Sequence, residues 1–138
     1  MASLIYNSFL EDVAKGAIDC DTDTFKTLLV TSTYTPNQDT HDKRDDVTNE
    51  VTGTGYTAGG ATTACTVAKD TTNNKTTLTF AAASWATSTI TARGAVIYKS
   101  RGGASSADEL VAYVDFGNDV SSSGATFSVS SSVITLQL

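Results

Sequence analysis

Apolar residues follow both faces of two segments near the middle of the chain, residues 90–98 and 109–116. In each segment alternate and neighbouring positions are both apolar, which is the pattern of a strand covered on two sides. The run 101–106 between them, Arg-Gly-Gly-Ala-Ser-Ser, has the composition of a loop. We therefore expect these strands to form the central pair of the fold, with Trp85 at its entrance.

Further strand patterns lie on either side of this pair. Residues 25–33 are rich in Thr, Leu and Val and indicate an inner strand, while 62–69 and 75–81 indicate a hairpin. A Ser-rich turn at 118–124 and two short strands, one around Phe127 and one ending at Leu138, complete the set. About seven strands at this spacing predict a mainly β, single-domain antiparallel β-sandwich over residues 1–138, of jelly-roll or other Greek-key type.

One helix is predicted, over residues 3–17. Its apolar residues recur at every fourth position and are Ile5, Phe9, Val13 and Ala17, with Tyr6 and Leu10 beside them. Ser3 is expected to cap its start and Gly16 to end it. A helix of this length is marginal alone in water, so we expect its apolar stripe to dock on the sheet or on another subunit.

A long polar connection, residues 34–61, follows the first inner strand. It contains a turn at 34–37, one or two expected helical turns at 40–47 capped by Thr40, and an irregular, flexible glycine-rich loop at 53–60. Connections this long are uncommon in compact domains and often serve binding.

Composition narrows the classes of partner. The net charge of −6 and the pI of about 4.4 oppose non-specific nucleic-acid binding, which needs Lys and Arg to displace phosphate counterions. The N-terminal segment reaches Glu11 and Asp12 before any full apolar run, so we expect neither a signal peptide nor a membrane span, and synthesis in the cytoplasm. We expect Cys20 and Cys65 to be free thiols.

No group of residues indicates catalysis or a metal site. His41 is the only histidine and lies in a charged loop, where we expect it to be exposed, and no nucleophile elbow is present. The spacing of Asp19, Asp21 and Asp23 begins like a calcium loop but lacks the glycine and glutamate that such a loop needs. The acidic residues between 39 and 50 are expected to pair with Lys43 and Arg44 among them on a solvated face. We assign no catalytic, cofactor-binding or metal-binding residue.

Two other patterns have ordinary explanations. The triplet at 115–117, Asp-Phe-Gly, occurs without the other motifs of a kinase, so we expect Phe116 in the core and Gly117 at a strand end. Among the aromatic residues, Trp85 and Tyr113 fit the core, and Tyr56 alone is expected to be free to contact a partner.

Three segments resemble small virion proteins of tailed bacteriophages. They are residues 49–60 (Asn-Glu-Val-Thr-Gly-Thr-Gly-Tyr-Thr-Ala-Gly-Gly), residues 91–98 together with Trp85, and residues 109–117. The resemblance implies a non-enzymatic capsid decoration, or cement, protein: a small β-sandwich on the capsid surface that binds the outer shell and bridges major capsid protein subunits to stabilise the head. The alternative is a tail- or fibre-associated virion protein that binds the host surface or other tail proteins.

The resemblance also implies the partners. They are the major capsid protein and further copies of the chain, as a dimer or trimer, with no cofactor. From the charge and the N-terminal segment we expect no nucleic acid and no membrane as partner. We expect the N-terminal arm and the 34–61 connection to make the contacts. The residues predicted for protein contact are Ile5, Tyr6, Phe9, Tyr34, His41, Arg44 and Tyr56.

Overall fold

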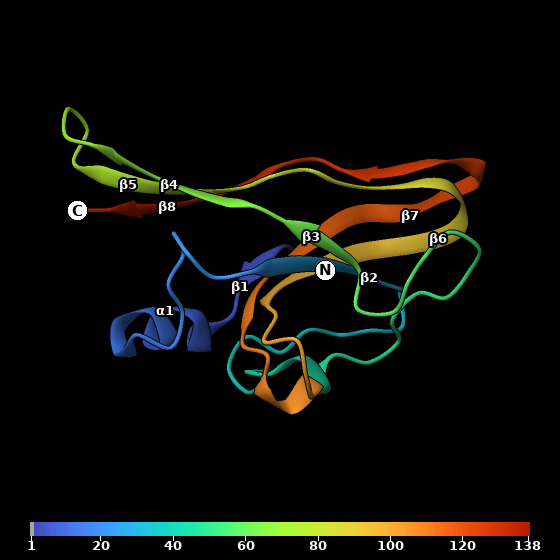
Figure 1. Cartoon of the computed structure of the whole chain (residues 1–138), viewed down its shortest axis with the longest axis horizontal. Coiled ribbons are helices and arrows are strands. Elements are labelled where there is room, and N and C mark those ends of the chain that lie inside the picture. Colours follow the sequence, from blue (N-terminus) through green and yellow to red (C-terminus); the bar gives the residue numbers. More distant parts are fainter. Residues whose placement is uncertain (1) are drawn as a thin grey trace.

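The computed structural model describes residues 2–138 as an antiparallel β-sandwich with one N-terminal helix (Figure 1), which confirms the predicted fold class. The elements are β1 (Leu4–Ile5), α1 (Asn7–Lys15), β2 (Phe25–Val30), η1 (Arg44–Asp46), β3 (Ala61–Thr63), β4 (Cys65–Asp70), β5 (Lys75–Phe80), β6 (Ala83–Lys99), η2 (Ser105–Ala107), β7 (Leu110–Val129) and β8 (Ser132–Gln137). The larger sheet has the order β1-β7-β6-β2-β3, and the smaller has the order β4-β5-β8.

A single long hairpin contributes to both layers. β6 and β7 pair from Tyr98 opposite Leu110 to Ala83 opposite Val129, with register shifts on both sides of Ser88. Near those shifts the ribbon folds back on itself (Figure 1). Beyond this hairpin, β5 and β8 continue the same antiparallel arrangement as the centre and one edge of the smaller sheet.

Both faces of the larger sheet are covered, as the apolar pattern of its central strands predicts. Along β6, Ala95 and Ile97 belong to the clusters between the two layers, whereas Val96 and Tyr98 belong to a cluster on the opposite face. Side chains on a strand alternate between faces, so consecutive apolar residues require cover on both sides. Burying one such large side chain stabilises the fold by about 1.5–3 kcal/mol.

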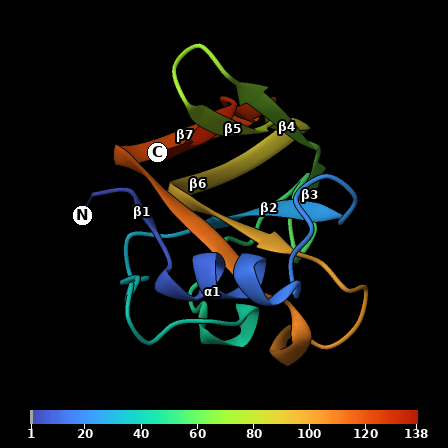
Figure 2. The same ribbon diagram turned by 90° about the vertical axis from the view of Figure 1, so that its left-hand side faces the viewer.

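The predicted helix is shorter in the structure, and its first residues form a strand. Leu4 and Ile5 pair with Tyr113 and Ala112 of β7, and the Ser3 hydroxyl accepts a hydrogen bond from the Asp115 N–H instead of capping the helix. The strand pairing satisfies backbone groups that a helix would otherwise use. The helix does dock on its own sheet (Figure 2), and Phe9 is fully buried there.

Gly16 ends α1 as predicted. Its left-handed backbone, with φ of +79°, lets its N–H reach the Val13 carbonyl, which closes the last turn.

The Ser-rich stretch predicted as a turn is part of β7, and Gly117 lies inside this strand instead of at its end. Two hydroxyls of the Ser-rich stretch have partners across the hairpin. The Ser88 and Ser122 hydroxyl oxygens lie 2.8 Å apart, and those of Thr91 and Ser121 lie 2.7 Å apart. Cross-strand hydroxyl pairs of this kind allow polar residues to sit in a sheet. The run therefore satisfies its polar groups within the sheet.

Two other boundaries differ from the sequence analysis. The helical turn expected over 40–47 is reduced to η1, and Thr40 does not cap it because its N-cap is Lys43. The predicted strand 62–69 is divided into β3 and β4, which belong to different sheets. The connection between β3 and β4 therefore joins the two layers.

Candidate interaction face

The N-terminal arm and the 34–61 connection, predicted separately as contact regions, lie against each other. The Asn7 N–H donates to the Gln38 carbonyl at 3.0 Å, and Gln38 Nε2 donates to the Ile5 carbonyl at 2.8 Å. Asn7 Nδ2 also donates to Asp39 Oδ1 at 2.7 Å. We define the helix–loop face as the exposed residues Asn7, Leu10, Glu11, Gln38, Asp39 and Asp42.

A buried chain of hydroxyls holds the arm to the connection beneath this face. The hydroxyl oxygens of Tyr6 and Tyr34 lie 2.9 Å apart, and the Tyr34 hydroxyl lies 2.9 Å from Nδ1 of His41. Burial, with the hydrogen bond to Tyr34, raises the pKa of Tyr6 well above its usual range, so this phenol stays neutral. His41, expected to be exposed, is partly buried and stacks on both tyrosine rings.

Three of the residues predicted for protein contact are therefore internal. Tyr6 and Phe9 are 0% exposed and Tyr34 is 4% exposed. These side chains are not accessible to a partner, so this part of the prediction is wrong for the folded chain. Of the others, Ile5, His41 and Arg44 are partly exposed at the border of the same region.

Arg44 joins the connection to the start of β7. Its Nε lies 2.7 Å from Oδ2 of Asp108, which is 1% exposed, and its guanidinium lies over the Tyr98 ring at 5.2 Å. Beside it, Glu109 accepts hydrogen bonds from Arg101 and lies 3.7 Å from Lys43 Nζ. The two cations of the 39–50 segment therefore pair with Asp108 and Glu109, and not with the carboxylates around them as expected.

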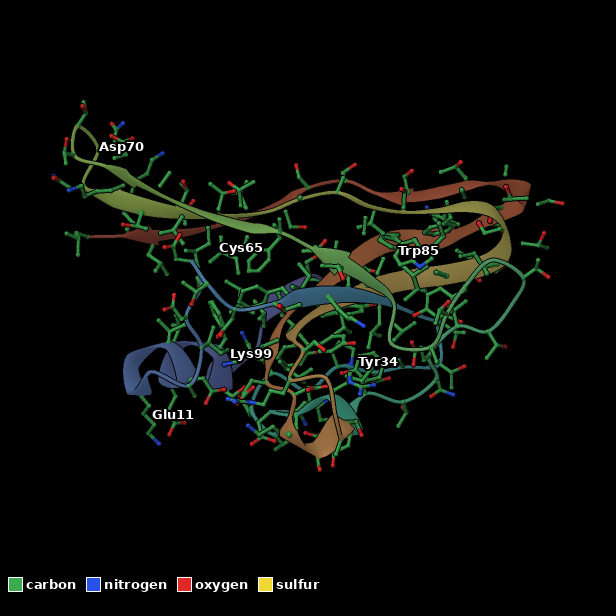
Figure 3. All side chains as sticks on the ribbon, in the orientation of Figure 1. Glu11, Tyr34, Cys65, Asp70, Trp85 and Lys99 are labelled. Carbon is green, nitrogen blue, oxygen red and sulfur yellow. The ribbon has the colours of Figure 1, made fainter. Side chains whose placement is uncertain are left out.

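Tyr56, predicted to be free for a partner, is bonded inside the chain. Its hydroxyl donates to Glu50 Oε1 at 2.7 Å and accepts the Leu29 N–H at 3.0 Å, and its ring lies 5.7 Å from that of Trp85. Figure 3 shows Trp85 in the interior of the sandwich. The glycine run around Tyr56 is an irregular loop, as predicted, and these contacts hold it against the sheet. The prediction that Tyr56 is free to contact a partner is wrong.

The segments that resemble virion proteins meet one another in the interior. The Tyr98 hydroxyl donates to the Gly59 carbonyl at 2.6 Å. At Gly60, with φ of +78°, an added Cβ would lie 1.9 Å from the Thr27 carbonyl oxygen, so the backbone of the run approaches β2 more closely than any side chain allows. These motifs are therefore explained by packing, and contacts with partners must use other residues.

The acidic residues show no arrangement for metal binding. Within residues 2–138, no three His, Cys, Asp or Glu side chains are placed together to hold a metal ion. Asp23, in the turn before β2, pairs with Lys99 at 2.8 Å, and Asp115 of the Asp-Phe-Gly triplet accepts from Arg93 at 3.2 Å. Asp23 and Asp115 therefore have structural contacts.

The two cysteines are free and lie side by side, each packed against the core. Burial raises the pKa of the Cys65 thiol to about 12. A thiol with such a pKa is protonated near neutral pH and is a poor nucleophile.

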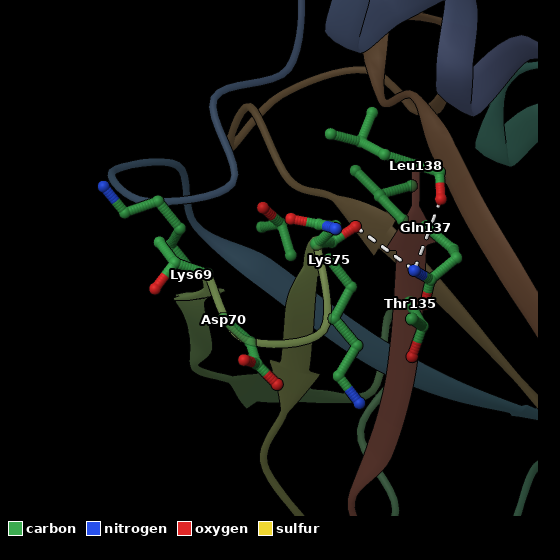
Figure 4. Close-up of a pocket in the computed structure, with 10 residues that line it drawn as sticks. Lys69, Asp70, Lys75, Thr135, Gln137 and Leu138 are labelled. Atoms are coloured by element: carbon green, nitrogen blue, oxygen red, sulfur yellow. Dashed lines mark hydrogen bonds between the residues drawn. The ribbon is translucent and has the colours of Figure 1, made fainter.

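A surface hollow of about 570 Å³ lies at the free end of the smaller sheet. It is lined by the β4–β5 turn and the end of β8, where Gln137 Nε2 donates to the Asn74 carbonyl at 3.2 Å (Figure 4). Its lining includes Lys69, Asp70 and Lys75 but no His, Cys or Ser. A triad built on Ser or Cys with His therefore has no place in this hollow.

Leu10 is a surface residue that sequence reasoning assigned to the wrong side of the helix. It is 53% exposed on α1, although its position beside the apolar stripe predicts burial. An exposed leucine between Asn7 and Glu11 is an apolar point on an otherwise polar and acidic face. The only sequence signal is its offset from the four-residue repeat of the buried stripe.

Comparisons of the chain with protein-family models, with curated proteins and with solved structures found no match. Within residues 2–138, no helix has both the length and the apolar character needed to cross a membrane.

Proposed function

We propose that this chain is a non-enzymatic virion protein that decorates the capsid of a tailed bacteriophage, binding the outer shell and bridging major capsid protein subunits. The observation that carries the proposal is the position of the segments that resemble virion proteins. They form the interior joint between the glycine run, Trp85 and the central hairpin. These segments belong to the scaffold of the fold, so recognition of the capsid is left to the exposed surface.

The placement of the chemically reactive groups agrees with a binding role. The one histidine is bonded to Tyr34, and the two most buried carboxylates, Asp108 and Glu109, are held by cations. These groups stabilise the joints between the arm, the connection and the sheet. Because these groups are engaged within the fold, a partner protein must be bound by other, exposed side chains.

The helix–loop face is the surface that we propose contacts the capsid. Hydrogen bonds fix its two halves to each other, so little conformational entropy is lost when it binds. Glu11 already pairs with Lys15, but the carboxylates of Asp39 and Asp42 suit a partner surface rich in Lys and Arg. The exposed Leu10 provides an apolar anchor on the same face. A rigid acidic face with one apolar point predicts binding that weakens with salt.

The tail-associated alternative is motivated by exposed aromatic residues and by the Thr-rich surface. Tyr56 and Trp85 contact each other inside the chain, so they cannot form a platform for a host glycan. This removes the aromatic ground for the alternative, and we therefore favour capsid binding.

The test is binding of the purified chain to expanded capsids that lack it, prepared from a deletion mutant of a phage that normally encodes the chain. We expect saturable binding and a higher temperature of capsid disruption. Leu10→Lys should weaken binding about tenfold, since an apolar anchor of this size contributes on the order of 1–2 kcal/mol.

Val120→Lys is the matched control, because Val120 is 43% exposed on β7, outside the helix–loop face. It should bind as the unmodified chain does. Absence of binding by the unmodified chain would overturn the proposed function, and equal losses for the two variants would overturn the assignment of the face.

A further inference from the structure

β8 is an open edge of the smaller sheet. It pairs with β5 alone, in unbroken register from Ser132 opposite Phe80 to Gln137 opposite Lys75. Just past the strand, the Leu138 N–H donates to the Asn74 carbonyl at 3.0 Å, which fixes the phase of the ladder. In an antiparallel pair, alternate residues direct their backbone groups to the partner strand. The N–H and C=O groups of Val133, Thr135 and Gln137 therefore point away from β5.

This edge lacks the features that normally prevent strand pairing. It has no charged side chain, no proline and no bulge, and Val133 is 57% exposed. Natural edge strands are usually protected by one of these features, most often a lysine. The opposite edge of the sheet, β4, carries Lys69 and Asp70.

The edge of the larger sheet at β1 is also protected. β1 is only two residues long, and Gln38 Nε2 donates to the Ile5 carbonyl. The other edge of this sheet, β3, is only three residues long. β8 is therefore the longest edge strand without a charged side chain, and the one to which another strand can most readily pair.

The distribution of charged residues indicates which molecule provides the added strand. The chain carries a net charge of −6, yet residues 120–138 contain no Asp, Glu, Lys or Arg. Two copies of an acidic chain repel each other over most of their surfaces. Along β8 they can approach without bringing like-charged side chains together.

We propose that β8 pairs with β8 of a second copy of this chain, antiparallel and about a two-fold axis. The outward-facing residues then exchange hydrogen bonds, with Thr135 opposite its own symmetry mate and Val133 opposite Gln137 of the partner subunit. The two three-stranded sheets become one continuous sheet. A two-fold contact of this kind is self-complementary and closes at two subunits. The inference rests on the sheet edge and on its lack of charge, and it does not depend on the proposed capsid role.

The test is the mass of the chain in solution by light scattering and sedimentation velocity. The contact is small for a protein interface, so we expect a dimer that dissociates on dilution between about 500 and about 5 µM. The mass should rise from 14.3 kDa towards twice that value as the concentration increases.

Three substitutions at one position test the geometry. Thr135→Pro removes an N–H that faces away from β5, so the monomer should keep its fold while dimerisation is lost. Thr135→Lys and Thr135→Glu should each remain monomeric, because like charges then face each other across the axis, and mixing the two should restore the dimer. Thr66→Lys, at an exposed position of β4, is the matched control and should dimerise normally.

Amide hydrogen exchange gives a readout at the level of single residues. The amides of Val133, Thr135 and Gln137 should become protected only as the concentration rises, whereas those of Ile134 and Leu136 should be protected at every concentration. A mass that stays at 14.3 kDa throughout, or one that reaches three chains, would overturn the inference. So would dimerisation of Thr135→Pro or of Thr135→Lys alone at the concentrations where the unmodified chain dimerises.

Discussion

Replacing Gly60 by alanine tests whether the glycine-rich run is packed against the sheet. Gly60 has φ of +78°, and an added Cβ would lie 1.9 Å from the Thr27 carbonyl oxygen. Gly102 has the same φ, but nothing lies within 4 Å of its added Cβ. The two positions therefore share the backbone strain and differ only in the steric clash.

The strain of a left-handed alanine costs about 1 kcal/mol, which is the whole effect expected for Gly102→Ala. At Gly60 the run must also move away from β2. This motion weakens the bond from the Tyr98 hydroxyl to the Gly59 carbonyl and that from the Gly59 N–H to Glu50, each worth about 1 kcal/mol. We expect Gly60→Ala to lower the free energy of unfolding by about 3–4 kcal/mol.

Urea unfolding followed by Trp85 fluorescence measures both variants, because Trp85 is the only tryptophan and contacts the run through Tyr56. The midpoint should fall by a much larger amount for Gly60→Ala, with an unchanged slope. Equal shifts for the two variants would show that the run does not contact β2 as described, and the account of the glycine motif would then be wrong.

Three further predictions concern buried groups. Tyr34→Phe removes the hydroxyl that joins Tyr6 to the connection, and it should destabilise the chain by about 1–3 kcal/mol in urea unfolding because partners lose a buried hydrogen bond. Burial raises the pKa of Glu109, but hydrogen bonds from Arg101 outweigh this effect and lower the pKa below its usual 4.5. The ionised Glu109 therefore stabilises the fold above pH 4.5, and this stabilisation is lost as the pH falls further. The thermal midpoint of Glu109→Gln should for this reason depend less on pH between 6 and 3 than that of the unmodified chain. Because burial raises the pKa of Cys65 to about 12, its alkylation at pH 8 should be over ~100-fold slower than that of a free cysteine, and rapid labelling in the native state would contradict this.

The sequence predicted the centre of the fold well because its apolar pattern is strong there. Consecutive apolar residues such as Val96 and Ile97 require cover on both faces, and the structure places them in different core clusters. The prediction from the sequence failed where polar side chains form hydrogen bonds with residues far away in the chain. Ser122 resembles a turn residue until its hydrogen bond to Ser88, 34 positions away, is known.

The contact residues were predicted less well for a related reason. The residue pattern identified the arm and the connection, and the structure brings these two segments together. It could not show that Tyr6 and Tyr34 point towards each other, because an aromatic residue in a polar segment suits an interface as well as a buried joint. Tyr56 was misplaced in the same way, since its partners Glu50 and Leu29 become neighbours only after folding.

A cryo-EM map of the virion of a phage that encodes this chain tests the proposed function most directly. The account predicts density for the sandwich on the outer surface of the capsid, with the helix–loop face against the major capsid protein and Leu10 in the contact. Density for the chain in the tail alone, or on the capsid with the helix–loop face turned towards solvent, would contradict it.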